Sequence, residues 1–220
     1  MELFTIGHSN HSIEAFIALL QQHGVTALAD VRSHPYSRYL PHFNQTPLKT
    51  ALFDAGIRYV FLGRELGARP SEPTCYVDGK ALYERIASTE LFSQGIQRIL
   101  KGAETYKIAL MCAEKDPVTC HRAILVGQHL REFTLDIHHI LRNGNLETHQ
   151  HLEERLLELH GLKQPESIEP VQLSLFNDLS LPAQSAMQYS KEDSLKEAYK
   201  RQGDQIAYVE RTENQHEQFS

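Results

Sequence analysis

Short, mostly apolar runs alternate with segments of helical periodicity through the first 160 residues of the chain. The apolar runs predict strands at residues 3–6, 25–31, 57–62, 108–112 and 135–141. Apolar positions three and four residues apart predict helices between and after them, at residues 12–24, 46–56, 82–100, after 116, and 149–160. This alternation favours an α/β fold in three layers, with a mostly parallel sheet of about five strands and helices on both faces.

The pattern changes after residue 160. Residues 161–220 are rich in Gln, Glu, Ser and Asn, and they contribute −4 of the net charge of −6. A segment with so few clustered apolar residues buries too little surface to offset its ordering entropy. We therefore expect a folded domain over residues 1–160 and a flexible, disordered tail over residues 161–220, with a brief helix at residues 195–199.

The composition excludes several classes of protein. The chain has no run of eighteen apolar residues, so a membrane-spanning helix is not expected. Its first residues lack the basic and apolar regions of a signal peptide, and its three cysteines do not make a disulfide framework. We expect a cytoplasmic protein without a membrane partner. The net charge of −6 argues against a surface that is basic throughout, as nucleic-acid-binding proteins often have.

Polar residues follow four of the predicted strands, at the sheet edge where open α/β folds bind ligands. These residues are 7–9, 30–32, 63–65 and 112–115. The candidates for proton transfer are His8, Asp30, Glu114 and His121. Asp30 and Glu114 could form a hydrolytic pair of carboxylates, or each could pair with an arginine, and both interpretations stay open. Other histidines are expected at the surface: His138, His139, His149, His151 and His160.

Residues 112–122 carry the densest set of reactive side chains. Asp116 is a good N-cap and Pro117 a good first helical residue, which predicts that Cys120 lies in or near the first helical turn. The helix dipole and Arg122 would attract an anion to this turn and lower the pKa of Cys120.

Three interpretations of this segment remain open. In the first, Cys120 packs as a small apolar residue while His121 and Arg122 bind phosphate. In the second, Cys120 is a catalytic nucleophile with His121 as its proton partner. In the third, Cys112, Cys120 and His121 bind a metal, although the segment lacks a close Cys-x-x-Cys pair. We rank them in this order, so no metal ligand is assigned and the cofactor is left unknown.

A second candidate segment, residues 32–43, interleaves arginine and histidine with aromatic residues. Residues 32–69 carry six Lys and Arg against two acidic residues, a local charge of +4. Arginines bind phosphates and aromatic rings stack on bases, so the segment suits a nucleotide or single-stranded DNA. The alternative is a solvated loop with packed tyrosines. The residues expected to bind phosphate or substrate are Ser9, Arg32, Ser33, Arg38, Lys115 and Arg122.

Three stretches of the sequence together resemble a known family. They are Thr5-Ile6-Gly7-His8-Ser9, then Asp30-Val31-Arg32-Ser33 with Pro35 and Ser37-Arg38, and then Cys112-Ala113-Glu114-Lys115 through Cys120-His121-Arg122. The family is a bacterial and archaeal one, catalogued as domain of unknown function 488, and the resemblance covers roughly residues 1–145. It implies a compact α/β domain. It implies no activity, because none is assigned to the family.

The tail contains a short motif, Gln172-Leu173-Ser174-Leu175-Phe176. It resembles the peptide by which bacterial proteins bind the DNA polymerase sliding clamp, and all five positions match. Leu175 and Phe176 would enter a groove as apolar anchors, while Gln172 would supply a hydrogen bond. The alternative is that the apolar residues fold back on the domain as a short strand.

These observations predict a protein that processes DNA or nucleotides, by hydrolysis or transfer at a phosphate or glycosidic bond, and that is recruited to the sliding clamp. Two alternatives belong to other classes. One is a non-catalytic adaptor that binds nucleic acid or a nucleotide and carries it to the clamp. The other is a thiol or metal enzyme unrelated to DNA.

Overall fold

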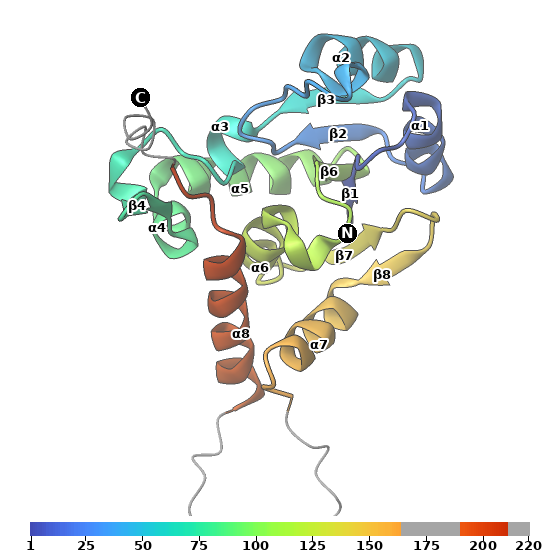
Figure 1. Ribbon diagram of the computed structural model, residues 1–220. Coiled ribbons are helices and arrows are strands. Elements are labelled where there is room, and N and C mark those ends of the chain that lie inside the picture. The colour runs from blue at the N-terminus through green and yellow to red at the C-terminus, as the bar shows by residue number, and fades with distance from the viewer. Residues whose placement is uncertain (164–189, 211–220) are drawn as a thin grey trace, which may run out of the picture.

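A computed structural model of the chain describes residues 1–163 and 190–210 (Figure 1). Its main sheet has six strands in the order β3-β2-β6-β1-β7-β8. The strands are β1 (Glu2–Gly7), β2 (Ala27–Asp30), β3 (Arg58–Phe61), β6 (Ile108–Cys112), β7 (Asp136–Ile140) and β8 (Leu146–Thr148). Neighbouring strands are parallel except β8, which pairs antiparallel with β7. The predicted α/β fold with a mostly parallel sheet is confirmed, and β8 is the strand that the sequence pattern did not predict.

Helices cover both faces of the sheet. One face packs against α1 (Ile13–Gln22) and α2 (Gln45–Asp54). The other face packs against a larger group of helical segments: α3 (Gly63–Leu66), α4 (Tyr83–Ala87), α5 (Glu90–Ala103), the π-helix η4 (Arg122–Gly127) and α6 (Gln128–Leu130). The rest of the structure includes three short 3-10 helices and a small hairpin: η1 (Pro41–Phe43), η2 (Pro73–Cys75), η3 (Pro117–Thr119), β4 (Tyr76–Val77) and β5 (Lys80–Ala81). None of the helices in the described part of the chain is long and apolar enough to cross a membrane.

The first helix forms where the sequence predicts it. The Ser12 hydroxyl accepts a hydrogen bond from the backbone N–H of Ala15 at 3.2 Å, which satisfies a free donor of the first turn. Gly24 follows the helix with a φ of 66°, a conformation that glycine adopts without strain. The chain can therefore reverse directly into β2, and this reversal brings the end of β2 to the same sheet edge as the end of β1.

Residues 116–122 differ from the prediction. The Asp116 carboxylate caps a helix, since it accepts a hydrogen bond from Val118 N at 3.0 Å, but this helix is the three-residue η3. Cys120 then has an extended backbone, with φ −132° and ψ 136°, and η4 begins at Arg122. Cys120 therefore lies between two short helices and not within the helix that Asp116 caps, and its side chain is 1% exposed.

Residues 190–210 also differ from the expectation of a tail that is flexible from residue 161 onward. They form α8 (Lys191–Ile206), which lies beside α7 (His149–Leu159) (Figure 1). Leu195, Ala198 and Tyr199 are buried in an apolar cluster shared with η4 and α7. The Gln202 amide donates a hydrogen bond to the Val118 carbonyl at 2.9 Å. The brief helix expected at residues 195–199 is thus part of a longer helix that packs on the domain, and the polar composition did not reveal this packing because the few apolar residues lie on the face that contacts the domain.

Two histidines expected at the surface are buried. His139 is 0% exposed and His149 is 6% exposed. They join a chain of polar contacts in which Thr5 Oγ1 lies 2.7 Å from His139 Nδ1, His139 Nε2 lies 3.1 Å from His149 Nδ1, and His149 Nε2 lies 2.9 Å from the Tyr199 hydroxyl. Burial lowers the pKa of His149 to about 4, so the ring is neutral at pH 7. The surface prediction failed because each ring finds a hydrogen-bond partner from a distant part of the chain.

Candidate active site

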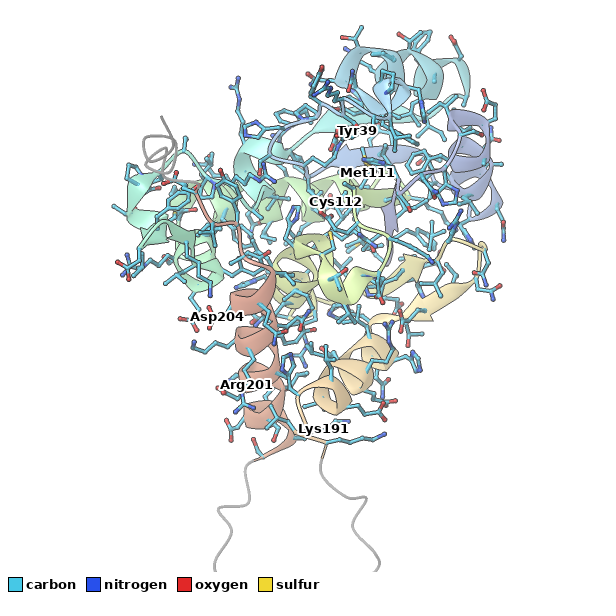
Figure 2. All side chains as sticks on the ribbon, in the orientation of Figure 1. Tyr39, Met111, Cys112, Lys191, Arg201 and Asp204 are labelled. Atoms are coloured by element: carbon cyan, nitrogen blue, oxygen red, sulfur yellow. The ribbon has the colours of Figure 1, made fainter. Side chains whose placement is uncertain are left out.

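A cavity of about 330 Å³ opens at the carboxyl ends of β1, β2 and β6. His8 follows β1, Arg32 follows β2, and Cys112 and Glu114 lie at and just beyond the end of β6; with His121 they line the cavity. Figure 2 labels Cys112 near the middle of the molecule, at the end of β6. Three of the four polar strand ends recognised in the sequence thus meet at one site, as parallel strand ends do.

The opposite wall of the cavity comes from segments outside the main sheet. It includes Arg69, Tyr83, Ile206 and Tyr208. The Arg69 guanidinium lies 4.4 Å from the centre of the Tyr208 ring, a cation–π contact. The Tyr208 carbonyl accepts a hydrogen bond from Ala81 N at 2.9 Å, which fixes the chain after α8 against β5. Residues beyond α8 therefore help to enclose the site.

Four reactive side chains gather at this cavity, three of them in its lining and the fourth, Cys120, buried behind them. One ligating atom from each of Cys112, Glu114, Cys120 and His121 lies within 4.8 Å of the others. Cys112 Sγ is 3.6 Å from His121 Nδ1, and Cys120 Sγ is 2.9 Å from Glu114 Oε2. Glu114 is exposed, whereas Cys112, Cys120 and His121 are 3%, 1% and 8% exposed. The carboxylate is therefore the member of the group that solvent or a ligand reaches first.

The backbone fixes the tautomer of His121. Its Nε2 lies 3.0 Å from the Val31 carbonyl oxygen, which can only accept a hydrogen bond. Nε2 therefore carries a proton. In the neutral ring Nδ1 is then the unprotonated nitrogen, and it faces the sulfur of Cys112.

The four groups shift one another's pKa values. Burial raises the pKa of Cys112 well above its usual value. Glu114 is exposed as a residue, but its carboxylate packs against the buried thiols, and this desolvation, together with the Cys120 charge, raises its pKa as well. For Cys120, burial acts in the same direction, but hydrogen bonding with Cys112 and the positive charges of Arg122 and His121 bring its pKa well below the usual value. Burial lowers the pKa of His121, but its contact with Cys120 raises it more. Cys120 is thus the thiol in this cluster that most readily becomes a thiolate.

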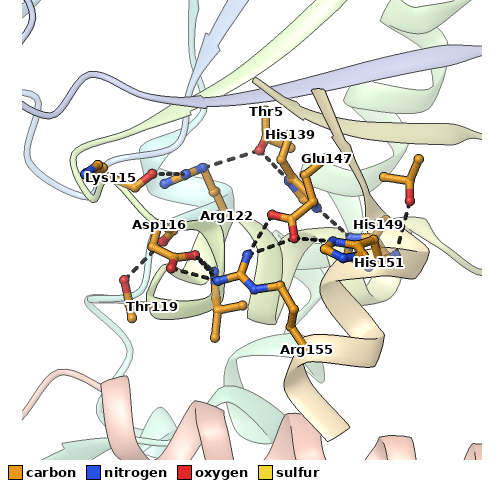
Figure 3. Close-up of polar contacts among 12 residues, drawn as sticks. Thr5, Lys115, Asp116, Thr119, Arg122, His139, Glu147, His149, His151 and Arg155 are labelled. Carbon is orange, nitrogen blue, oxygen red and sulfur yellow. Dashed lines mark hydrogen bonds and ion pairs between the residues drawn. The ribbon is translucent and has the colours of Figure 1, made fainter. Parts of the chain in front are cut away.

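Arg122 holds the loop that carries Glu114. Its side chain is 0% exposed, and it donates hydrogen bonds to the carbonyl oxygens of Glu114 at 2.7 Å and Lys115 at 3.3 Å. A third contact, from Nε to Thr5 Oγ1 at 3.4 Å, ties this loop to β1 (Figure 3). Gly7 lies against the same loop, where a Cβ would come within 1.8 Å of the Glu114 oxygen. Arg122 is therefore a structural cation and does not face the cavity.

A second arginine holds the far side of the loop. Arg155 on α7 donates to the carboxylate of Asp116, with a shortest distance of 2.8 Å, and to that of Glu147 at 2.8 Å (Figure 3). The loop that contains Cys120 is thus fixed at Arg122 on one side and at Arg155 on the other.

Arg32 is fixed by Asp30. The Asp30 carboxylate is 0% exposed and accepts two hydrogen bonds from the guanidinium, at 2.9 and 2.7 Å, and one from the Tyr59 hydroxyl at 2.9 Å. Asp30 therefore lies behind Arg32 and does not face Glu114 across the cavity. Arg32 also contacts His8, with Nη1 3.4 Å from Nε2, while the His8 ring stacks on Phe43. Burial lowers the pKa of His8 to about 4, so it is a neutral hydrogen-bonding group at pH 7.

The remaining predicted residues divide between the cavity and other places. Ser33 lines the cavity, and its hydroxyl accepts a hydrogen bond from Arg69 N at 2.9 Å. Ser9, Arg38 and Lys115 are not among the residues that line this cavity. The predicted partner-binding residues, Gln172, Leu173, Ser174, Leu175 and Phe176, lie outside the described part of the chain.

Several residues that line the cavity are not predicted by the sequence pattern. Arg69, Tyr83 and Tyr208 line the cavity, yet none of them follows a strand of the main sheet. For Arg69 a signal existed, since it belongs to the locally positive stretch of residues 32–69. For Tyr83 and Tyr208 the sequence offers no local signal, because their position depends on how α4 and α8 pack on the domain.

Comparison with known proteins identifies a family. A family model described as domain of unknown function DUF488 matches residues 12–128, slightly more than half of the chain. Neither the curated proteins nor the solved structures gave a match. The matched residues include Arg32 and the cluster of Cys112, Glu114, Cys120 and His121. The chain therefore belongs to the DUF488 family.

Proposed function

We propose that this protein is an enzyme that hydrolyses or transfers a phosphate or glycosidic bond of a nucleotide or of DNA. The observation that carries the proposal is the composition of the cavity at the sheet edge. Its described lining holds two arginines, Arg32 and Arg69, against a single carboxylate, which belongs to Glu114, and His8 adds a neutral hydrogen-bonding group. Such a lining favours an anionic substrate that meets one acidic group at the cavity floor.

The aromatic residues of the cavity favour a nucleotide over a simple anion. Tyr36, Tyr83 and Tyr208 line it, and Tyr36 is 71% exposed. Exposed aromatic rings stack on nucleic-acid bases, each such contact contributing roughly 1–3 kcal/mol. Arg32 and Arg69 would bind the phosphate, with Arg32 oriented by Asp30, and the tyrosines would hold the base.

Within this proposal Glu114 transfers the proton. Glu114 is exposed and lines the cavity, and its carboxylate lies against the buried thiol of Cys120. Cys120 itself is covered and does not line the cavity, so we do not propose it as the attacking group. An accessible carboxylate beside a cationic binding surface is the arrangement that general acid–base catalysis needs.

Glu114→Gln is expected to lower kcat by about 100-fold or more while substrate binding persists. The assay is release of phosphate or free base from a panel of nucleoside phosphates and single- and double-stranded DNA. His121→Ala is expected to abolish turnover in the same assay. Lys115→Gln is the matched control, since Lys115 is exposed, adjacent in sequence and outside the cavity.

Unchanged turnover in both Glu114→Gln and His121→Ala would contradict the assignment of these roles. Binding of a nucleotide or of DNA by the unaltered protein, without turnover of any member of the panel, would instead support the non-catalytic adaptor.

We further propose that residues 172–176 recruit this enzyme to the sliding clamp. The net charge of −6 predicts a weak, salt-sensitive affinity for DNA, and a tether to the clamp would raise the effective concentration at the DNA. The double variant Leu175→Ala/Phe176→Ala is expected to lose retention of the purified clamp in a pull-down. Leu173 is left intact, and Leu159→Ala serves as a control for general loss of apolar residues, because Leu159 is 60% exposed. Equal retention by the parent and the double variant would refute the motif.

A further inference from the structure

We infer that Cys112, Cys120, His121 and Glu114 form a binding site for a zinc-class transition-metal ion. The inference goes beyond the proposed function, because metal binding is measured without any substrate. It takes from that function only the location, the floor of the same cavity.

The donor set is the first argument. Two thiols, an imidazole and a carboxylate offer one ligand atom each, and all four atoms lie within 4.8 Å of one another. Thiolate and imidazole ligands together select zinc-like ions over magnesium or calcium, which prefer oxygen. The local sequence Cys-x-Glu followed by Cys-His supplies these donors from the last residue of β6 and the loop that follows it, without a close Cys-x-x-Cys pair.

The distances are the second argument. With Zn–S of about 2.3 Å and Zn–N of about 2.0–2.1 Å, the sulfur and nitrogen of a tetrahedral site are about 3.6 Å apart. Cys112 Sγ and His121 Nδ1 are separated by 3.6 Å. The 2.9 Å between Cys120 Sγ and Glu114 Oε2 is the separation of a hydrogen bond, in which one proton lies between the two atoms. An ion that replaces this proton would move the two atoms apart to ligand spacing.

The surroundings of the ligands are the third argument. Metal-binding histidines almost always donate their second ring N–H to a carbonyl or carboxylate. His121 does this, since Nε2 lies 3.0 Å from the Val31 carbonyl and Nδ1 faces the thiols. The Arg122 guanidinium holds the Glu114 carbonyl at 2.7 Å, so the loop that supplies three of the donors is rigid.

The four donors differ in exposure, and this difference assigns their roles. Cys112, Cys120 and His121 are buried, whereas Glu114 is exposed to the cavity. Three buried ligands and one that faces an open cavity match a catalytic zinc site, in which one position exchanges with water or substrate. The structure therefore points to Glu114 as the exchangeable ligand, and binding releases the thiol protons to solvent.

The full chain, freed of any affinity tag, is expected to bind one zinc ion, measured by elemental mass spectrometry. With cobalt as the probe, it should show the near-ultraviolet band of thiolate ligation and the visible bands of a tetrahedral ion. Cys112→Ser, Cys120→Ser and His121→Gln are each expected to weaken binding by about 100-fold or more. Cys75→Ala is the matched control, because Cys75 is also buried but lies outside the cluster.

Alkylation of the unaltered protein keeps the test decisive if a variant fails to fold. Zinc is expected to slow alkylation of Cys112 and Cys120 by at least about tenfold relative to chelator-treated protein, with no change at Cys75. The absence of both a cobalt–thiolate band and zinc-dependent protection would overturn the inference, as would equal loss of metal in the Cys75 variant. If Glu114→Gln loses turnover and the protein binds no stoichiometric metal, the proposed enzyme is supported and the metal site is refuted. If the protein binds metal but turns over no substrate, the metal site is supported and the proposed enzyme is refuted.

Discussion

Replacing Gly7 by alanine is expected to lower the free energy of unfolding by about 3 kcal/mol or more. The added Cβ would lie 1.8 Å from the carbonyl oxygen of Glu114 and 2.8 Å from its carbonyl carbon. Both atoms belong to backbone, and β1 and β6 are adjacent parallel strands, so neither side can move without breaking the sheet edge. Urea denaturation of the full chain measures the effect.

The loss should reach the site as well as the fold, because the displaced segment carries Glu114 and is held by Arg122. Gly56→Ala is the control. Gly56 has a φ of 74°, and an added Cβ there would meet no atom within 4 Å, so this substitution costs about 1 kcal/mol from backbone strain alone. Equal denaturation midpoints for the two variants would show that the close approach at Gly7 is not a constraint.

Removal of the Asp30 carboxylate is expected to destabilise the fold by about 3–5 kcal/mol, because it leaves Arg32 as an uncompensated buried charge. Arg32 is 6% exposed, and its shortest contact to Asp30 is 2.7 Å. The variant is Asp30→Ala, measured by urea denaturation. Tyr59→Phe removes a single hydrogen bond to the same carboxylate, at 2.9 Å, and should cost only about 1 kcal/mol.

A second variant tests whether the lost stability comes from the unpaired charge of Arg32 or from the lost volume of the Asp30 side chain. Asp30→Ala/Arg32→Met removes both charges and is expected to recover part of the lost stability. If the double variant is no more stable than Asp30→Ala, the unpaired charge is not the cause. Within the proposed function, Asp30 would position Arg32 for the phosphate, so a conservative Asp30→Glu should alter KM for a phosphate-bearing substrate more than kcat.

Local sequence signals were sufficient to predict five of the six strands of the main sheet. The strand at residues 108–112 has the bounds that the apolar run predicts, and Ser12 caps the first helix as its position predicts. Parallel strands place their carboxyl ends along one edge of the sheet, which is where ligands bind in such folds. Which of these ends meet depends on the strand order, and this order, which the sequence does not predict, places β2, β6 and β1 side by side with His8, Arg32 and Glu114 after them.

Local signals left a residue's role open where that role depends on the partner that the folded chain gives it. The sequence allowed Asp30 either a carboxylate or an arginine as its partner, and the fold supplies Arg32. Arg122 has the chemistry of a phosphate-binding residue, but its partner is the carbonyl oxygen of Glu114. Cys120 is preceded by a good helix start, yet packing draws it into an extended conformation beside Cys112. Capping rules describe the first residues of a helix and say nothing about how soon it ends.

The wall formed by Ile206 and Tyr208 has a consequence for the order in which the protein becomes competent during synthesis. The sheet and the cluster of cysteines are complete once residue 148 has emerged from the ribosome, and domains generally fold in this order, N-terminal parts first. The cavity, however, gains its last wall only when residue 208 has emerged and paired with Ala81. A nascent chain that has not yet exposed residue 208 would therefore hold the reactive groups in a more open cleft, and the closed cavity would form only after that residue has emerged.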